Sequence, residues 1–189
     1  PWVVKSQIHA GGRGAGQFNI PFNDSGGVQI VFHQDKVIEI AKSMMGNVLI
    51  TKQTGNKGKK VNRIFIEEGC EIEREFYLSL LVDRKSSKLM MILSSAGGID
   101  IEDIAITNPE KICNIYFENF DEVVLPKKLK KYLGINESQF IELSEIAKKL
   151  SNTFKNIDAS IIEINPLVLN KEGNFILLDA KISLDDNAF

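Results

Sequence analysis

The chain has 189 residues, of which 43% are hydrophobic and 25% are charged, and it contains 14 glycines and 5 prolines. This is the composition of an ordinary folded domain, which excludes disordered, collagen-like, coiled-coil and low-complexity chains. The 23 Lys and Arg residues nearly balance the 25 Asp and Glu residues, so we expect no nucleic acid or membrane surface as a partner bound through charge.

The first part of the chain predicts strands around a glycine-rich loop. Strands are predicted at residues 1–9, 28–32, 48–52 and 61–67, where β-forming side chains are frequent. The loop Gly11–Gly16 follows the first strand and separates it from the second. A helix is predicted over residues 36–45, with Asp35 as its N-cap and Gly46 as its end.

The second part of the chain predicts two hairpins and a long helix. Strands are predicted at residues 76–83, 89–94, 161–169 and 174–181. Asn136 and Gln139 have the spacing of a capping box at the start of the helix. An apolar stripe then recurs at helical spacing at Phe140, Leu143, Ala147, Leu150 and Phe154. Helices and hairpins without regular βαβ alternation predict an α+β fold in two lobes, 1–70 and 71–189.

The last hairpin aligns polar side chains. Gly173 suits the left-handed position that closes a three-residue loop. That loop sets a register in which Asn165 lies opposite Asp179 and Glu163 opposite Lys181, and directly opposed residues share one face. Amide and carboxylate oxygens at this spacing suit Mg²⁺. The alternative is a half-exposed hairpin with its polar residues outward, and the spacing alone does not decide between the two.

The glycine loop and an acidic segment are candidate nucleotide contacts. Repeated glycines allow backbone N–H groups to approach an anion, and Lys5 and Arg13 would add positive charge. The spacing matches neither a Walker A motif nor a dinucleotide fingerprint, so a flexible turn is an equal alternative. Residues 64–75 predict a strand followed by an acidic turn, which would present its backbone to a purine and a Glu to a ribose. The alternative there is an exposed acidic loop between two lobes.

Several segments together resemble one enzyme family. They are Pro1-Trp2-Val3-Val4-Lys5, Gln7–Gly14, Ile162–Val168, Leu178–Lys181 and Asp186–Phe189. These segments are similar to the β subunit of succinyl-CoA synthetase (succinate–CoA ligase), and the resemblance covers essentially the whole chain. It implies an ATP-grasp fold, in which two lobes clamp a nucleotide.

The resemblance also implies roles for individual residues. The nucleotide would be held by Lys5, Gly12, Arg13, Gly14, Glu67, Cys70 and Glu75. Of these, Lys5 and the glycine turn would face the phosphates, the segment from Glu67 to Cys70 the adenine, and Glu75 the ribose.

The resemblance implies metal binding or catalysis as the role of three further residues. The resemblance implies that Asn165 and Asp179 bind Mg²⁺, and these are the two residues that the hairpin register pairs. Glu163 would lie close to the transferring phosphoryl group as a catalytic residue. Because Mg²⁺ offsets the charge of that group, catalysis would consist of positioning and electrostatics.

Members of the family interconvert succinyl-CoA, phosphate and a nucleoside diphosphate with succinate, CoA and the triphosphate, a reaction of the tricarboxylic acid cycle. The resemblance implies a partner α subunit that carries a phosphohistidine and the CoA site, in an αβ or α₂β₂ complex. It implies ATP and ADP as the nucleotides, with GTP and GDP as alternatives. A malate–CoA ligase or related acid–thiol ligase, or a non-catalytic nucleotide-binding module, would be the alternative function.

The chain departs from the family pattern at several positions. Ala15 stands where many relatives have Lys, and the longer insertion 17–25 follows. Cys70 stands where Thr is common, so a backbone contact is expected there. The resemblance also implies that the family's first segment and its C-terminal CoA-ligase domain are not part of these 189 residues. We therefore expect a piece that binds nucleotide and Mg²⁺ but does not turn over alone.

The two cysteines and the hydropathy pattern bear on the compartment. Cys70 and Cys113 are far apart and have no metal-ligand companions at suitable spacing, which predicts reduced thiols. No apolar run approaches the roughly 18–20 residues of a membrane span. A bacterial cytoplasm is expected, with a mitochondrial matrix as the alternative.

Overall fold

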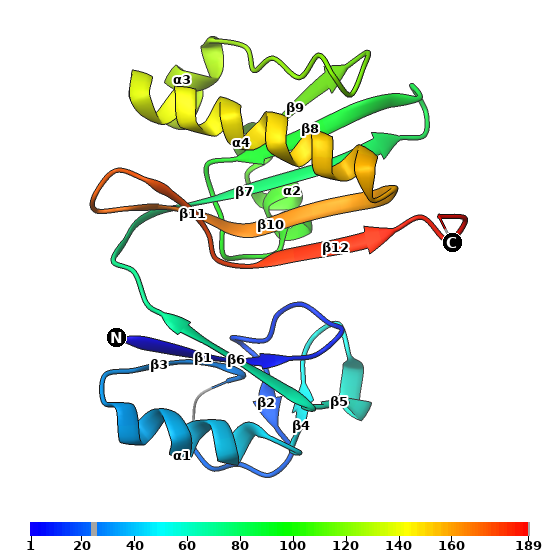
Figure 1. Cartoon of the computed structure of the whole chain (residues 1–189). Coiled ribbons are helices and arrows are strands. Elements are labelled where there is room, and N and C mark those ends of the chain that lie inside the picture. The colour runs from blue at the N-terminus through cyan, green and yellow to red at the C-terminus, as the bar shows by residue number, and fades with distance from the viewer. Residues whose placement is uncertain (24–25, 189) are drawn as a thin grey trace. The chain divides into compact units, whose positions relative to one another are not determined.

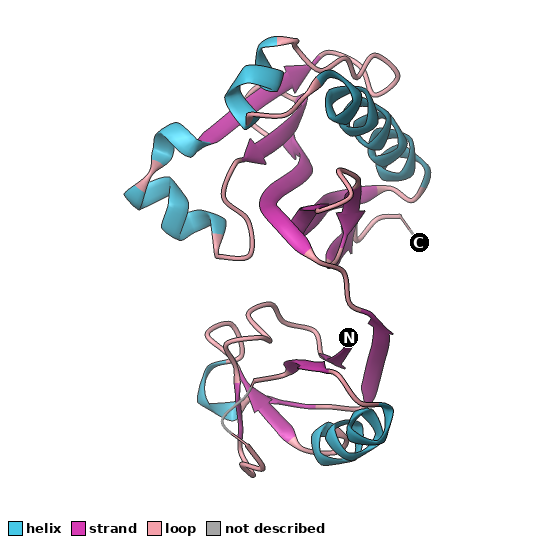
Figure 2. Cartoon of the chain, turned by 90° about the vertical axis from the view of Figure 1, so that its left-hand side faces the viewer, coloured by secondary structure: helices cyan, strands magenta, loops and turns pink. Residues whose placement is uncertain are grey.

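The computed structural model describes residues 1–23 and 26–188 and divides the chain into two compact units, Pro1–Cys70 and Glu71–Phe189. We call them unit 1 and unit 2 and describe each by itself. Each unit combines β-sheet with helix (Figures 1 and 2). Asp24 and Ser25, which end the predicted insertion, and the C-terminal Phe189 lie outside the described residues.

Unit 1 is built from two small antiparallel sheets and one long helix. Its elements are β1 (Trp2–Gln7), β2 (Gln17–Phe18), β3 (Val28–Val31), α1 (Gln34–Met44), β4 (Val48–Ile50), the 3₁₀ helix η1 (Gly55–Lys57), β5 (Lys59–Lys60) and β6 (Arg63–Glu68). One sheet has the order β3-β1-β6 and the other the order β2-β4-β5. The two strands predicted on either side of the glycine loop are present as β1 and β3, and the structure pairs them with each other in antiparallel orientation.

The two faces of β1 differ, because successive side chains point to opposite sides of a sheet. Val4 and Ser6 are fully buried on the face against α1, where the Ser6 hydroxyl lies 3.4 Å from the Met44 sulfur. Lys5 belongs to the opposite face. The core of unit 1 consists of Val4, Phe18, Val31, Val37, Met44, Leu49 and Val61.

The predicted cap of α1 is wrong. The N-cap is His33, whose side chain makes no capping hydrogen bond, and Asp35 lies within the first turn. A carboxylate there still favours the helix, because it faces the positive end of the helix dipole. The end of the helix is as expected, with the C-cap at Met45 followed by Gly46 at φ +80°.

Unit 2 is one antiparallel sheet with helices. Its elements are β7 (Ile72–Asp83), β8 (Lys88–Ser94), α2 (Ile101–Thr107), the 3₁₀ helix η2 (Pro109–Lys111), β9 (Ile112–Phe117), α3 (Lys128–Leu133), α4 (Glu137–Asn156), β10 (Ala159–Asn170), β11 (Phe175–Leu177) and β12 (Ala180–Leu184). The strand order is β11-β10-β7-β8-β9, and β12 also pairs with β10. The acidic segment before residue 76, expected as a turn, is divided: Glu67 and Glu68 end β6, residues 69–71 connect the strands, and Ile72 begins β7.

Helix α4 covers one face of this sheet (Figure 1). Its predicted capping box is present: Asn136 Oδ1 accepts the Gln139 N–H at 2.9 Å, and Gln139 Oε1 accepts the Asn136 N–H at 2.9 Å. Four residues of the predicted stripe are buried and Leu150 is partly buried. The stripe packs against buried residues of β7 such as Phe76, Leu78 and Leu80, which leaves the alternate residues of β7 on the other face.

The predicted register of the last hairpin is confirmed. Glu163 pairs with Lys181 on β12, and Leu167 pairs with Leu177 on β11. The strand predicted over residues 174–181 is interrupted, so that Leu178 and Asp179 lie between β11 and β12. Gly173 has a φ of +87°, which is the left-handed conformation that the loop requires.

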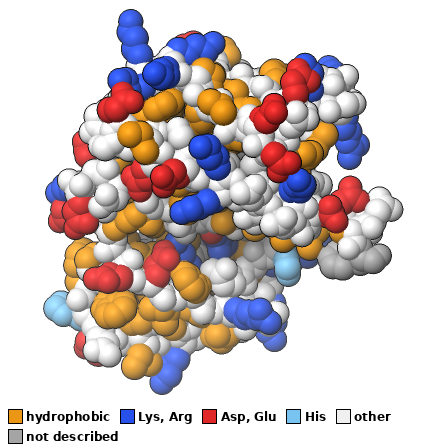
Figure 3. All heavy atoms as spheres, turned by 45° about the horizontal axis from the view of Figure 1, so that its top comes forward, with side chains coloured by type: hydrophobic (Ala, Val, Ile, Leu, Met, Phe, Trp, Pro, Cys, Tyr) orange, Lys and Arg blue, Asp and Glu red, His pale blue; other side chains and the backbone are white. Residues whose placement is uncertain are grey.

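Charges of both signs are interspersed with apolar side chains on the face shown in Figure 3. The basic run at residues 127–131, expected as a surface segment before a helix, lies mostly within α3. Among the described residues, no helix combines the length and the hydropathy that a membrane crossing requires.

Candidate functional site

In unit 1, the predicted phosphate residue and the predicted adenine residue form an ion pair. Strand β1 places Val3 opposite Glu67 and Lys5 opposite Phe65, so Lys5 and Glu67 are diagonal neighbours on one face of the sheet. The Lys5 ammonium contacts the Glu67 carboxylate, and the two side chains are 8% and 25% exposed. Since a buried charge requires a partner, this pair keeps a cation at a nearly buried position on the sheet.

The glycine loop packs tightly and returns to β1. Arg13 donates from Nη1 to the Ser6 carbonyl oxygen at 3.0 Å, and its own carbonyl accepts the Gly27 N–H at 2.8 Å. A Cβ added to Gly26 would lie 2.0 Å from the Gly14 carbonyl oxygen. Glycine is therefore required where two backbone segments touch, so the loop is held in place next to Lys5 by its own contacts.

Cys70, the last residue of the segment predicted to face the adenine, lies half-buried at the end of unit 1. It follows Gly69, whose N–H donates to the Pro1 carbonyl oxygen at 2.8 Å. This bond fixes the chain after β6 to the start of β1. The backbone around Cys70 is thereby positioned together with the strand that bears Lys5.

In unit 2, Asn165 and Asp179 face each other across the last hairpin. The Asn165 N–H donates to the Asp179 carbonyl oxygen at 3.1 Å. The Asn165 side chain is held by the loop between β8 and α2: its Oδ1 accepts the Gly98 N–H at 2.8 Å, and its Nδ2 donates to the Ile99 carbonyl oxygen at 3.0 Å. The orientation of the amide is therefore fixed, and Oδ1 retains a second lone pair.

This donor set fits Mg²⁺. An amide oxygen and a carboxylate are hard oxygen ligands, and both residues are half-buried. Mg²⁺ in phosphate-handling sites commonly takes one or two protein oxygens and completes its octahedron with water and phosphate. No group of three or more His, Cys, Asp or Glu side chains that could hold a metal gathers in the part of the chain that the structure describes.

Glu75, the predicted ribose residue, lies against the same loop as Asn165. A Cβ added to Gly98 would come within 2.3 Å of Glu75 Oε2, and Gly98 has a φ of +75°. The carboxylate of Glu75 and the amide of Asn165 thus meet at the backbone of Gly98. No role was predicted for this loop, although its doublet Gly97-Gly98 is a sequence signal of a close approach of backbone.

Glu163, the predicted catalytic residue, has a tyrosine beside it. The Tyr77 hydroxyl donates to Glu163 Oε2 at 3.3 Å. Burial is the main cause that raises the pKa of Tyr77 well above its usual value, and the Glu163 carboxylate adds to this shift. Ser79 Oγ is buried and has no hydrogen-bond partner among the described residues. Polar Tyr77 and Ser79 alternate with leucines on β7, which was the available sequence signal.

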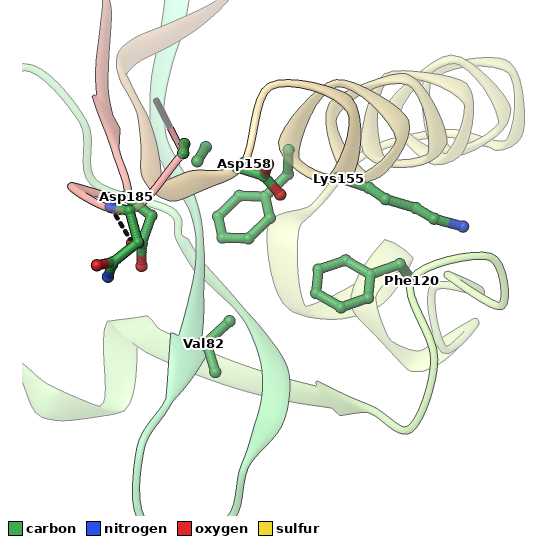
Figure 4. A pocket seen from close by; sticks show the side chains of 9 residues that line it. Val82, Phe120, Lys155, Asp158 and Asp185 are labelled. Carbon is green, nitrogen blue, oxygen red and sulfur yellow. Dashed lines mark hydrogen bonds between the residues drawn. The ribbon is translucent and has the colours of Figure 1, made fainter.

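A separate hollow of about 410 Å³ lies in unit 2 (Figure 4). It is lined by, among others, Val82, Phe120, Phe154, Lys155, Asp158 and Asp185. The rings of Phe120 and Phe154 stack with their centroids 5.8 Å apart. None of the residues predicted for the functional site lines this hollow.

The sequence of the chain is similar to one family and to a group of curated proteins. The family model described as an ATP-grasp domain matches residues 1–169. The subunit beta of the ADP-forming succinate–CoA ligase of Nitrobacter hamburgensis is 45% identical over 190 residues. The protein of the same name from Rhodopseudomonas palustris is 46% identical over 190 residues. Each alignment covers 99% of this chain and 48% of the relative, so the chain spans about half the length of these curated relatives.

Solved structures share the fold at low sequence identity. The ATP citrate lyase of Methanothrix soehngenii matches with a TM-score of 0.67 and 16% identity, over 98% of this chain and 38% of that chain. A dinucleotide-forming acetyl-coenzyme A synthetase of Ca. Korarchaeum cryptofilum matches with a TM-score of 0.60 and 15% identity, over 98% of this chain and 76% of that chain. At these identities the likeness concerns the fold alone.

Proposed function

The chain belongs to the ATP-grasp domain family, and we propose that it is the nucleotide-binding part of the β subunit of an ADP-forming succinate–CoA ligase. The observation that carries this proposal is the 45% identity, over 99% of the chain, to subunits of that name. The arrangement of the predicted residues supports it, because most of them make defined contacts within their own unit.

We propose that the nucleotide is held by Lys5, Gly12, Arg13, Gly14, Glu67, Cys70 and Glu75. Lys5 and the glycine turn would bind the phosphates, since Lys5 supplies positive charge and the turn supplies backbone N–H groups. The backbone from Glu67 to Cys70 would serve the adenine, and Glu75 the ribose hydroxyls. Support comes from the Lys5–Glu67 ion pair and from the contacts that hold the turn beside β1.

We propose Asn165 and Asp179 as the ligands of Mg²⁺. The ion would supply positive charge to the transferring phosphoryl group. The chain's own contribution is a backbone hydrogen bond that joins residues 165 and 179 across the hairpin, together with the contacts that fix the amide of Asn165 on the loop at Gly98. An amide fixed in advance loses little further freedom when it binds a ligand.

We propose Glu163 as a catalytic residue at the phosphoryl group. In the reaction the P–N bond of a phosphohistidine breaks and a P–O bond to the terminal phosphate of ADP forms, and the reverse reaction exchanges the two bonds. The phosphohistidine and the CoA site would belong to a partner α subunit, in an αβ or α₂β₂ complex. GTP and GDP are alternative nucleotides, and the bacterial relatives support a bacterial cytoplasm as the compartment.

The activity is tested on the full-length protein assembled with its α subunit. With succinate, CoA, ATP and Mg²⁺ we expect formation of succinyl-CoA and ADP, with ATP preferred over GTP. If the complex turns over malate better than succinate, the proposed acid substrate is wrong and the activity is that of a related acid–thiol ligase. A complex that turns over neither acid would overturn the proposed function.

The metal site is tested separately by titrating ATP into the chain with and without Mg²⁺. We expect Mg²⁺ to raise the affinity in the wild type and Asp179→Ala to remove most of that gain. Asp186→Ala, an exposed aspartate seven residues further along, is the matched control and should behave as the wild type. If the affinity for ATP changes neither on addition of Mg²⁺ nor in Asp179→Ala, the result favours a non-catalytic nucleotide-binding module.

A further inference from the structure

The side chain of Glu163 has one hydrogen-bond donor among the described residues, the hydroxyl of Tyr77. The two residues lie on neighbouring strands, since Ser79 on β7 is directly opposite Glu163 on β10. Tyr77 is two residues along β7 from Ser79 and therefore presents its side chain on the same face. This face is opposite to the one on which Leu78 and Leu80 join the core under α4.

The phenol of Tyr77 is suited to hold a carboxylate without reacting. Its ring is 2% exposed, so the hydroxyl has few alternative positions. Burial raises its pKa, which keeps it protonated and able to donate at any physiological pH. A hydrogen bond to a charged acceptor is roughly twice as strong as a neutral one. Glu163 Oε2 is thereby occupied, and Oε1 is left for another group.

The remaining groups near the carboxylate do not take over this role. Lys181 lies directly opposite Glu163 on β12 but is exposed, so its long side chain is not held in one conformation beside the carboxylate. Glu102 of α2 is negatively charged like Glu163, and like Glu163 it raises the pKa of Tyr77. The hydroxyl of Ser79 is buried and makes no hydrogen bond among the described residues. Of these side chains, Tyr77 is therefore the one that holds the Glu163 carboxylate in a fixed position.

We propose that Tyr77 is a positioning residue for Glu163, an inference that rests on the proposed function. Its hydroxyl fixes one carboxylate oxygen so that the other faces the phosphoryl group in a single orientation. A residue of this kind raises the rate of the chemical step and leaves the affinity for the nucleotide unchanged, because it acts through the catalytic carboxylate and touches no substrate.

The test is a double-mutant cycle in the full-length αβ complex, with Tyr77→Phe, Glu163→Gln and the double variant. Tyr77→Phe keeps the ring and removes only the hydroxyl. We expect kcat to fall about tenfold, the effect of losing a hydrogen bond to a charged group, while KM for ATP changes less than about twofold. In the Glu163→Gln background, the same substitution should change kcat less than about twofold, since the carboxylate that it positions is absent.

Tyr116→Phe is the matched control. Tyr116 lies on β9 opposite Met90, on the same sheet face as Tyr77, but it is half exposed. It should leave kcat, KM and the melting temperature unchanged, and Tyr77→Phe should retain the wild-type circular dichroism spectrum. Two results overturn the inference: a kcat of Tyr77→Phe equal to that of the wild type, or an equal loss in the wild-type and Glu163→Gln backgrounds. A wild-type complex without ligase activity instead refutes the proposed function, and the inference falls with it.

Discussion

Neutralising Glu67 should destabilise unit 1, because the Glu67 carboxylate contacts the nearly buried ammonium of Lys5. Removing one partner of a buried pair costs about 3–5 kcal/mol. Glu67 is 25% exposed, so solvent screens part of the interaction, and Gln keeps a carbonyl oxygen that can accept from the ammonium. We therefore expect Glu67→Gln to lower the free energy of unfolding of unit 1 by about 2 kcal/mol.

The chain contains a convenient probe for this measurement. Its single tryptophan, Trp2, lies on β1 three residues from Lys5, so fluorescence during urea unfolding reports on unit 1. Glu68→Gln is the matched control, since Glu68 is the next residue of β6 and is exposed; it should change the free energy by less than about 0.5 kcal/mol. If the two variants unfold at the same urea concentration with the same slope, the reasoning from the ion pair is refuted.

Three further outcomes follow from local contacts. Asn136→Ala removes half of the capping box of α4 and should cost unit 2 about 1 kcal/mol of unfolding free energy, measured by circular dichroism in urea. The hydrogen bond from Ser86 lowers the pKa of Asp83 in the folded state. The Asp83 carboxylate therefore stabilises the fold at pH values above its pKa in the unfolded chain, and this effect is lost as the pH falls through its pKa in the folded chain. Ser86→Ala should raise the pKa of Asp83 measured by NMR. Gly26→Ala places a Cβ 2.0 Å from a backbone carbonyl oxygen and should cost unit 1 more than Gly46→Ala, which meets no atom within 4 Å and is strained only through its φ of +80°; equal melting curves would contradict this.

The elements that the sequence predicted well carry their signal in a short stretch of chain. The capping box requires only Asn136 and Gln139, and both of its hydrogen bonds are local. The register of the last hairpin follows from the position of Gly173 and was correct for Glu163 and Lys181. In each case a few neighbouring residues determine the geometry, so an analysis of the sequence alone suffices.

The elements that were missed depend on distant contacts. The edge strand β9 was not predicted; it has only six residues, and its pairing with β8 defines it as a strand. The cap of α1 was misplaced because Asp35 satisfies the composition rule for a cap as well as for a first turn. The contacts of Asn165 with the loop at Gly98 join residues 67 positions apart, and although Gly97-Gly98 indicates a close approach of backbone, neither segment alone identifies its partner.

These long-range contacts change how the predicted site is understood. Spacing alone presents Asn165 as a free metal ligand and Glu163 as a free carboxylate. In the structure the first is fixed by two backbone groups of a loop that also packs against Glu75, and the second is held by Tyr77. Contacts within unit 2 therefore hold the side chains of Asn165 and Glu163 in defined positions. Preorganisation of this kind is what a reaction that depends on positioning and electrostatics requires of its protein.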